Sequence, residues 1–391
     1  MKIEYIETNS KLCTIRAHYS VGSALEYKSR KWNNGLAHVV EHMIYKQNEH
    51  LHNELGLIGA DWNGSTFYNE IMFIASAPSN NVLELIKIFK ELLLNNKFSK
   101  ENLEKERSVV LEEESMIKND LSRNISLEKD KFLCKGYITK EIGGSVNSIK
   151  KITVEEVQEF YDTYLTLDHL LLVITGPPIS EHVGEIFGRT NDTFIEPEFA
   201  NNAPRTKKKK TKYFSQLRGS ARVFISYFCE PAWSKQNMVL NLISCFFSSG
   251  MDTRLFKTLR SEQGLVYSVG GGPSLYSDIG WYNIIAVTQK HNIKKVIDSI
   301  AKEVDNLKHE KITKEELIKS RYKELNYLYT LTETSYGKNS LASRQIISKI
   351  PGADELEELI NEISVDDMVQ AIEDVFIEEN QRIFIASPRS K

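Results

Sequence analysis

The sequence has no run of 18 consecutive apolar residues, so no membrane-spanning segment is expected. The first residues lack the apolar segment of a signal peptide, and none is expected. Cysteine is scarce: the chain has 4, far apart and without a C-x-x-C pair (Cys13, Cys134, Cys229, Cys245). This usage predicts free thiols in a reducing compartment, which makes the cytoplasm the expected location.

An excess of positive charge is also missing. The formal net charge is −3, which argues against a nucleic-acid-binding protein. The basic run Lys207–Lys210 is interpreted as a solvated linker rather than a binding tail. Hydrophobic residues make up 41% and charged residues 26%, as is typical of a globular protein. A length of 391 residues exceeds one ordinary hydrophobic core, so two domains are expected.

Two segments that read as helix starts repeat along the chain. Thr153 and Ser364 are 211 positions apart, and each stands before acidic residues as a helix N-cap does. Each predicted helix is followed by an apolar run that ends in proline, Leu170–Pro177 and Ile383–Pro388. The repeat predicts two copies of one fold, although coincidence between ordinary helix starts is the alternative.

A second repeat supports the duplication. Ser99 and Thr313 precede similar charged segments at an offset of 214 residues. Within those segments the pair Lys105 and Arg107 recurs as Lys319 and Arg321. Because the two matches are independent and nearly equal in offset, we expect homologous halves.

The boundary between the halves is expected in Pro197–Lys212, which has no periodicity. The predicted organisation is a first domain at 1–195, a linker at 196–212 and a second domain at 213–391. Predicted first-half elements are strands at Leu12–Tyr19 and Thr66–Ala77, and helices at Gly35–Lys46 with Asn34 as cap, at Asn81–Asn95, and from Ser99 past Met116. This order favours an α+β fold, each domain a mostly antiparallel sheet covered by helices.

The most informative motif is His38-Val39-Val40-Glu41-His42. On a helix, positions i and i+4 share a face, so two imidazoles could hold a metal ion while Glu41 lies beside them. This is the H-x-x-E-H pattern of metal-dependent hydrolases. Chance alone would give it in about one chain in a hundred, so surface or core histidines are the alternative until other residues support the motif.

A catalytic zinc usually takes three protein ligands and leaves one position for water. The predicted long helix offers Glu106 and Glu113, seven residues apart and therefore on one face. Glu112 and Glu114 flank Glu113 but point around the helix. The spacing alone leaves the choice among these acids open, with Glu112 the main rival to Glu113.

Four blocks together resemble one known family. They are His38-Val39-Val40-Glu41-His42, Asn63-Gly64-Ser65-Thr66, Glu106 to Glu113, and Arg254 to Tyr267. The sequence resembles the pitrilysin family of zinc metallopeptidases, the inverted zincins, in the branch similar to mitochondrial processing peptidase. The resemblance implies one zinc ion per chain, held by His38, His42 and Glu113.

The resemblance also implies roles for residues outside the motif. Glu106 falls on the family's supporting acid. The segment Asn63, Gly64, Ser65 and Thr66 falls on the substrate-binding edge strand, with Gly64 where the family has alanine. Arg260 and Tyr267 match residues that reach over to the active site. The segment Gln47–His50 departs from the family pattern, which bears on substrate detail.

Only the first half should hold metal. The offset of 214 places Tyr327 at the position of Glu113 and Ser320 at that of Glu106. The second half has no H-x-x-E-H motif and only two histidines, His291 and His309. We therefore expect the second domain to contribute packing and substrate contacts.

The expected activity is zinc-dependent endopeptidase action on peptide substrates. Glu41 would act as general base, Tyr267 would stabilise the oxyanion and Arg260 would anchor substrate carbonyls. The resemblance implies that unfolded peptides, or precursor and leader peptides, are enclosed in a chamber. Long members of the family carry four such units and this chain two, so a homodimer or a heterodimer with a related chain is expected. The alternative is a non-catalytic scaffold or the partner subunit of a peptidase heterodimer.

Overall fold

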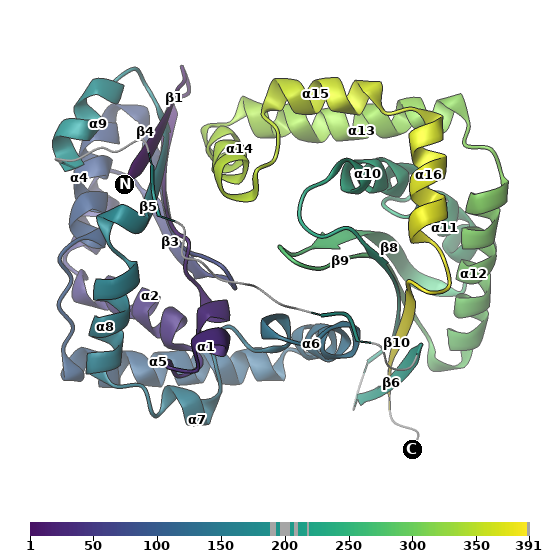
Figure 1. The fold of residues 1–391 in the computed structure, drawn as a ribbon, viewed down its shortest axis with the longest axis horizontal. Helices are drawn as coiled ribbons and strands as arrows, with labels where there is room; N and C mark the ends of the chain where they lie inside the picture. Colours follow the sequence, from purple (N-terminus) through teal and green to yellow (C-terminus); the bar gives the residue numbers. More distant parts are fainter. Residues whose placement is uncertain (188–192, 196–203, 207–209, 217–218, 389–391) are drawn as a thin grey trace. The chain divides into compact units, whose positions relative to one another are not determined.

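The computed structural model describes residues 1–187, 193–195, 204–206, 210–216 and 219–388 (Figure 1). They belong to two compact units. The first unit consists of Met1–Leu127, Gly136–Asn202 and Leu331–Ile346, and the second of Glu128–Lys135, Ala203–Thr330 and Ile347–Lys391. Most of the predicted linker, 196–212, lies outside the described residues, and a division there stays a prediction.

The first unit is built on a five-stranded sheet. Its strands are β1 Lys2–Glu7, β2 Leu12–Tyr19, β3 Asp61–Thr66, β4 Ile71–Pro78 and β5 Leu170–Gly176. The order is β1-β5-β2-β4-β3, with β1 and β5 parallel and the other neighbours antiparallel. The predicted strand at Leu12–Tyr19 is confirmed, but the single strand predicted at Thr66–Ala77 is wrong, because Thr66 ends β3 and a turn separates it from β4.

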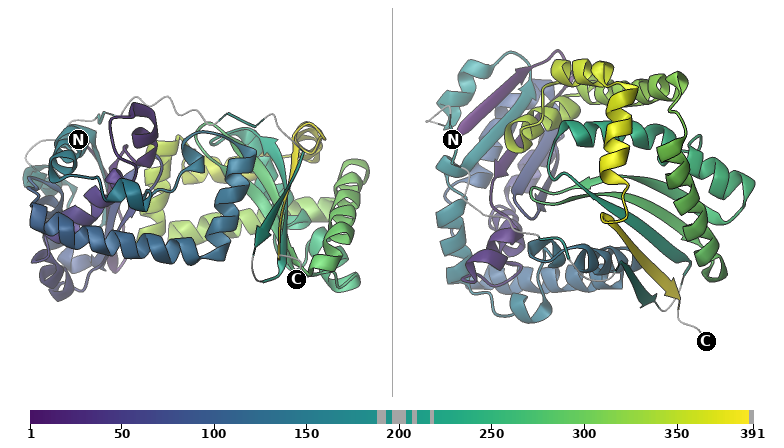
Figure 2. Two further views of the ribbon diagram at one scale, coloured as in Figure 1. Left: turned by 90° about the horizontal axis from the view of Figure 1, so that it is seen from below. Right: turned by 45° about the vertical axis from the view of Figure 1, so that its right-hand side comes forward.

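Helices flank this sheet. They are α1 Ser23–Ser29, α2 Leu36–Gln47, α3 Leu51–Leu57, α4 Val82–Leu93, α5 Lys100–Asn119, α7 Val146–Ile149, α8 Val154–Tyr164 and α9 Ser180–Phe187. Figures 1 and 2 show α2 and α4 on one face of the sheet. Helix α4 turns Leu85, Phe89 and Leu92 into the core at helical spacing. The predicted helix at Asn81–Asn95 is thus confirmed within two residues, as is Ser99 as the N-cap of α5, accepting a hydrogen bond from Asn102 N.

The opposite face of the first sheet is covered by α14, Ser335–Ser348, which comes from the second half of the sequence. Fully buried Asn339 uses its Nδ2 to donate hydrogen bonds to Thr14 O at 3.1 Å and Val173 O at 2.8 Å. The hydroxyl of Thr175 donates to the carbonyl oxygen of Ser335 at 3.0 Å. Hydrogen bonds therefore hold this helix against the sheet.

The second unit repeats the first in topology. Its strands are β6 Thr211–Gln216, β7 Ala221–Cys229, β8 Val266–Leu275, β9 Gly280–Thr288 and β10 Gln381–Pro388. The order β6-β10-β7-β9-β8 has one parallel pair, β6 with β10, and antiparallel neighbours elsewhere. Its helices are α10 Lys235–Phe247, α11 Arg254–Phe256, α12 Ile293–His309, α13 Lys314–Glu333, α15 Ala353–Glu362 and α16 Val365–Val375.

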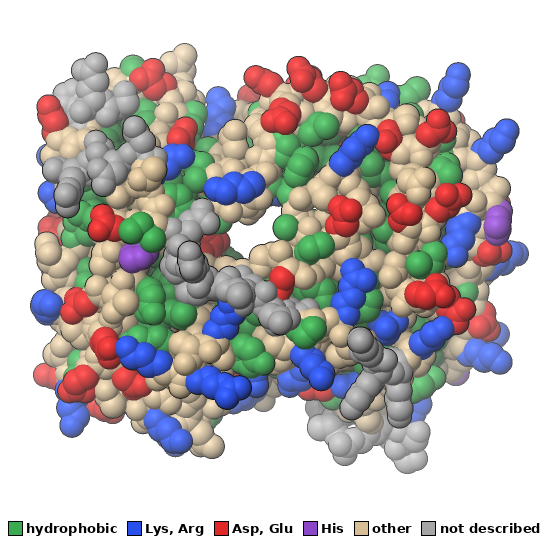
Figure 3. Space-filling view, in the orientation of Figure 1, with side chains coloured by type: hydrophobic (Ala, Val, Ile, Leu, Met, Phe, Trp, Pro, Cys, Tyr) green, Lys and Arg blue, Asp and Glu red, His purple; other side chains and the backbone are tan. Residues whose placement is uncertain are grey.

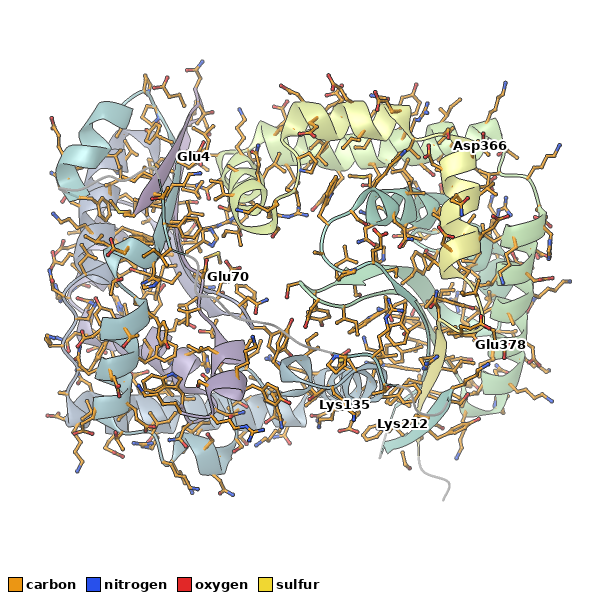
Figure 4. The ribbon with its side chains drawn as sticks, viewed as in Figure 1. Glu4, Glu70, Lys135, Lys212, Asp366 and Glu378 are labelled. Atoms are coloured by element: carbon orange, nitrogen blue, oxygen red, sulfur yellow. The ribbon has the colours of Figure 1, made fainter. Side chains whose placement is uncertain are left out.

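One face of the second sheet receives a segment from the first half of the sequence. Helix α6, Leu121–Leu133, enters the second unit at Glu128. The Lys129 ammonium lies 5.2 Å from the ring centroid of Trp281, and the Phe132 and Phe384 rings are 6.2 Å apart. Lys212 of β6, labelled in Figure 4, donates to Glu128 at 3.2 Å. Each sheet thus packs against a helical segment from the other half of the sequence, α14 on the first sheet and the end of α6 on the second.

Matching hydrogen bonds confirm the duplication. Arg107 donates to Ile152 O at 2.8 Å, and Arg321 donates to Ile363 O at 2.7 Å. Directly after these carbonyl groups, Thr153 and Ser364 each close a capping box. The predicted α+β fold of two homologous, mostly antiparallel domains is therefore correct.

The described helices include none with the length and apolar character needed to cross a bilayer. Helix α15 is rich in acidic residues (Asp354, Glu355, Glu357, Glu358, Glu362), and Figure 3 shows acidic side chains gathered over this helix.

Candidate metal centre

Helix α2 carries the histidine motif, and its N-terminus is fixed by a buried acid. Gly35 is the N-cap, with φ at 95°, a conformation that favours glycine. The amide groups of Gly35 and Ala37 donate to the two carboxylate oxygens of Glu26, each at 2.7 Å. Burial raises the pKa of Glu26 to about 8. The prediction of Asn34 as cap is wrong because the capping oxygens come from α1, nine residues before the cap.

The three predicted ligands come together within the first unit. Nε2 of His38 and Nε2 of His42 lie 3.6 Å and 3.4 Å from Oε2 of Glu113. All three ligand atoms are within 4.8 Å of one another, and they form the one such group found among the described residues. Glu112, the rival for the third position, is exposed and outside the group.

These donors suit a catalytic zinc. Bonds of about 2.0–2.2 Å in a tetrahedral arrangement separate neighbouring donors by roughly 3.3–3.6 Å, and the two distances from the histidine nitrogens to Glu113 lie in this range. Two imidazoles and one carboxylate leave a fourth position for water or substrate. The group is reached from a cavity of about 670 Å³ that the ligands line together with β3.

Glu106 supports His42 from the same helix that carries Glu113. Its Oε2 lies 3.2 Å from Nδ1 of His42, so the other ring nitrogen faces Glu113. Burial lowers the pKa of His42, but hydrogen bonds to Glu106 and Glu113 outweigh it and raise the pKa to about 9. For His38, burial and the nearby His42 lower the pKa to about 4. Of the two histidines, His42 is therefore the one whose charged form the neighbouring acids favour.

Glu41 is buried beside the ligands. The Thr66 hydroxyl donates to its Oε2 at 2.9 Å, and burial raises its pKa. A Cβ atom at Gly64 would lie 2.5 Å from Oε1 of Glu41 and 2.6 Å from Cε2 of Tyr45. The absence of a side chain at Gly64 therefore lets β3 approach α2 closely.

Strand β3 is the edge of its sheet and pairs with β4 alone among the described strands. Side chains alternate along a strand, so Trp62, Gly64 and Thr66 share the face toward α2, whereas Asn63 and Ser65 face the other way. Asn63 turns its Oδ1 back to accept a hydrogen bond from Gly64 N at 2.9 Å. The predicted substrate-binding segment thus lies beside the metal group with an open backbone edge.

An aromatic wall was missed at the sequence level. The ring centroids of Tyr45 and Trp62 are 4.9 Å apart, and those of His52 and Trp62 are 4.5 Å apart. All three line the cavity. The signal available in the sequence was strand alternation, which places Trp62 on the same face as Thr66. Nothing local to His52 indicated that it would join them.

Arg260 and Tyr267 lie in the second unit, near each other. Arg260 belongs to the π-helical turn Lys257–Glu262 and donates from Nη1 to Val266 O at 2.7 Å. Its guanidinium carbon is 5.6 Å from the ring centroid of Tyr267, which is 77% exposed. Their predicted contribution to the active site stays a prediction.

The sequence offset pairs Ser320 of the second unit with Glu106, and Tyr327 with the proposed ligand Glu113. Ser320 is buried and Tyr327 is exposed. Its described residues contain no cluster of three metal-ligating side chains.

Comparison with known protein families agrees with this division. Residues 2–132 match the family described as insulinase (peptidase family M16), and residues 151–322 match the peptidase M16 inactive domain. The chain belongs to peptidase family M16. The resemblance to the pitrilysin family is thereby confirmed, and the M16 match that spans the histidine motif is the one in the first half.

Relatives extend over most of the chain. An uncharacterised zinc protease of Rickettsia felis is 24% identical over 372 residues, covering 91% of this chain and 88% of that protein. The zinc protease YmxG of Bacillus subtilis is 22% identical over 379 residues, covering 92% and 89%. The mitochondrial-processing peptidase subunit beta of Dictyostelium discoideum is 29% identical over 175 residues, covering 42% and 36%. The chain is thus similar to zinc proteases along its length.

Solved structures share the fold. A protease from Helicobacter pylori superimposes with a TM-score of 0.85 at 16% identity, covering 99% of this chain and 97% of that one. A structure of Pseudomonas fluorescens described as a peptidase M16 inactive domain gives 0.84 at 16% identity, covering 99% and 95%.

Proposed function

We propose that this M16 protein is a zinc-dependent endopeptidase that cleaves extended peptides. The observation that carries the proposal is the convergence of two imidazole Nε2 atoms and Oε2 of Glu113 beside the buried carboxylate of Glu41. Two histidines and one glutamate are a complete set of protein ligands for a hydrolytic zinc site.

A zinc ion bound by His38, His42 and Glu113 would polarise the scissile carbonyl group and lower the pKa of a water molecule toward about 7. Oε1 of Glu41 then takes a proton from the attacking water and delivers it to the leaving amine. Thr66 occupies Oε2 of the same carboxylate, which leaves Oε1 for proton transfer. Glu106 holds the imidazole of His42 in the tautomer that the site needs.

The edge strand β3 provides the means of substrate binding. An extended peptide can add to the open edge through backbone hydrogen bonds, which give affinity with little sequence selectivity. Asn63, Gly64, Ser65 and Thr66 contribute that edge. Unfolded peptides, including precursor or leader peptides, are therefore the substrate class, because a folded protein has no free extended segment to offer.

Arg260 and Tyr267 are proposed to act on the bound substrate from the second unit. Arg260 anchors a substrate carbonyl group, and the exposed hydroxyl of Tyr267 donates to the developing oxyanion. Arg260→Ala and Tyr267→Phe should slow cleavage and leave zinc content unchanged. Loss of zinc from either variant would contradict this assignment.

A chamber formed by two chains is the proposed assembly, as a homodimer or with a related chain. Enclosure would explain preference for unfolded peptides over folded proteins. Gel filtration with light scattering measures the assembly, and a monomer with full activity would contradict the chamber. The cytoplasmic location stays a prediction.

The decisive experiment measures zinc content and cleavage of a quenched peptide together. One zinc per chain is expected, with cleavage that a chelator abolishes and added zinc restores. A non-catalytic scaffold or partner subunit would show no cleavage even with zinc bound. That alternative is disfavoured because His38, Glu41, His42 and Glu113 are all present. Purified protein without metal or cleavage would overturn the proposal.

A further inference from the structure

The two ligand histidines differ in whether their second ring nitrogen, Nδ1, has a hydrogen-bond partner. Nδ1 of His42 lies 3.2 Å from Glu106. Nδ1 of His38 is fully buried and has no hydrogen-bond partner among the described residues. If Nε2 of His38 binds a metal ion, Nδ1 must carry the ring hydrogen, and metal-binding histidines almost always donate this hydrogen to an acceptor. The Nδ1–H group of His38 therefore needs an acceptor.

A buried acid lies next to this donor. Glu114 follows Glu113 on α5 but is turned inward, with 1% of its surface exposed. Its Oε2 is buried and also lacks a hydrogen-bond partner. A buried carboxyl oxygen without a partner costs stability. An unpaired donor and an unpaired acceptor are thus buried in the same part of the first unit.

Gly143 places the two groups against each other. A Cβ atom built on Gly143 would lie 1.7 Å from Oε1 of Glu114 and 3.2 Å from Nδ1 of His38. The carboxyl group therefore fills the space that a side chain at 143 would take, and the imidazole borders the same space. One water molecule, or a rotation of the carboxyl group, suffices to join them.

We propose that Glu114 is a positioning residue that accepts the hydrogen bond of His38 Nδ1, directly or through one water, and so holds Nε2 toward the metal. The inference rests on the proposed zinc-dependent function. It gives each histidine its own acid on α5, Glu106 for His42 and Glu114 for His38. Glu114 is not a ligand, because its carboxylate is outside the group formed by His38, His42 and Glu113.

The test measures zinc affinity by competition with a chelator of known affinity, and separately the unfolding of the zinc-free protein in urea. Glu114→Leu should weaken zinc binding by about tenfold to a hundredfold, the usual effect of losing such a partner. Glu114→Gln should weaken it less, because the amide oxygen still accepts a hydrogen bond. The exposed neighbour in Glu112→Gln is the matched control and should bind zinc as the wild type does.

Gly143→Ala tests the same contact from the other side. Its methyl group must displace the Glu114 carboxyl group, so zinc binding should weaken although every acid remains. Because both changes act on one contact, the double variant Gly143→Ala with Glu114→Gln should be little worse than the more affected single variant. The Gly143→Ala variants also test the inference if Glu114→Leu does not fold.

Two results would overturn the inference. Zinc affinity of Glu114→Leu within about twofold of the control would show that His38 does not need this acid. A loss of zinc affinity matched by an equal loss of stability in the zinc-free protein would show a structural role only. Absence of zinc binding in the wild type is a different outcome, which removes the proposed function itself.

Discussion

The hydroxyl group of Thr66 donates a 2.9 Å hydrogen bond to Oε2 of Glu41. The bond joins the edge strand β3 to the helix that carries the metal-binding histidines. It also leaves one oxygen of the carboxylate for proton transfer. The strand proposed to bind substrate and the proposed general base are therefore linked directly.

Thr66→Val should lower kcat about tenfold with little change in KM, because the carboxylate loses a partner worth about 1.5 kcal/mol. Steady-state kinetics on a quenched peptide measures both constants. Thr66→Ser restores the hydroxyl group and should recover most of the activity. Equal kcat values for the valine and serine variants would show that the hydrogen bond does not matter to turnover.

Glu41→Gln should retain zinc and lose peptide hydrolysis by a factor of about a hundred or more, since general base catalysis is typically worth that much. Zinc content by mass spectrometry and turnover are measured on the same sample. Glu49→Gln is the control, because Glu49 also lines the cavity but is paired with Lys46. Unchanged turnover in Glu41→Gln would remove its role as the base.

His42→Ala should abolish stoichiometric zinc binding, because the site would keep only two protein ligands. His50→Ala is the matched control: His50 is exposed on the same segment of the chain and paired with Glu91 at 2.8 Å. Its zinc content should equal that of the wild type. Metal loss in both variants would point to a general folding defect instead.

Asn339→Ala should destabilise the first unit by about 2 kcal/mol, because it leaves the Thr14 and Val173 carbonyl groups with one partner fewer in the interior. Urea unfolding measures the change. Asn361→Ala removes an exposed asparagine whose bond stays within its own helix, and should change stability by less than about 0.5 kcal/mol. Similar losses of stability in the two variants would show that the hydrogen bonds between α14 and the sheet contribute no stability.

The capping box of α16 should give the second unit a pH-dependent stability. Lys235 and Ser364 lower the pKa of Asp367 to about 2. A lowered pKa in the folded state means that the stabilisation is complete above the unfolded value near pH 4 and is lost as the pH falls toward 2. Asp367→Asn should therefore cost about 1 kcal/mol at pH 7 and much less near pH 2.

Urea unfolding of wild type and Asp367→Asn across this pH range measures the difference. The neighbouring Asp366, labelled in Figure 4, is exposed, and Asp366→Asn provides the control for removal of one negative charge. A constant difference between Asp367→Asn and wild type from pH 7 to pH 2 would contradict the assignment.

Much of the metal centre could be predicted from the sequence because its signals are local. The motif in α2 follows helical spacing, and Glu106 and Glu113 are two turns apart on one helix. The repeated helix caps at Thr153 and Ser364 likewise predicted the duplicated fold, because a capping box is encoded in four consecutive residues.

The contacts that surround the metal ligands could not be predicted because they join distant segments. Glu26 caps α2 from another helix, and Gly143 meets Glu114 from a loop. The division of Thr66–Ala77 into two strands depended on the turn between them, whose residues show no strong turn pattern. Helix α14 had no sequence signal for joining the first sheet, because the residues it contacts are spread over two strands.

The exchange of helical segments has a consequence for the integrity of the protein. Cleavage of the backbone between residues 195 and 210 would yield two fragments, each still holding a piece that completes the other's sheet. The nicked protein should therefore stay together on a sizing column without any covalent link. Either fragment produced alone would expose a bare sheet face and should depend on chaperones or on its missing counterpart to remain dispersed.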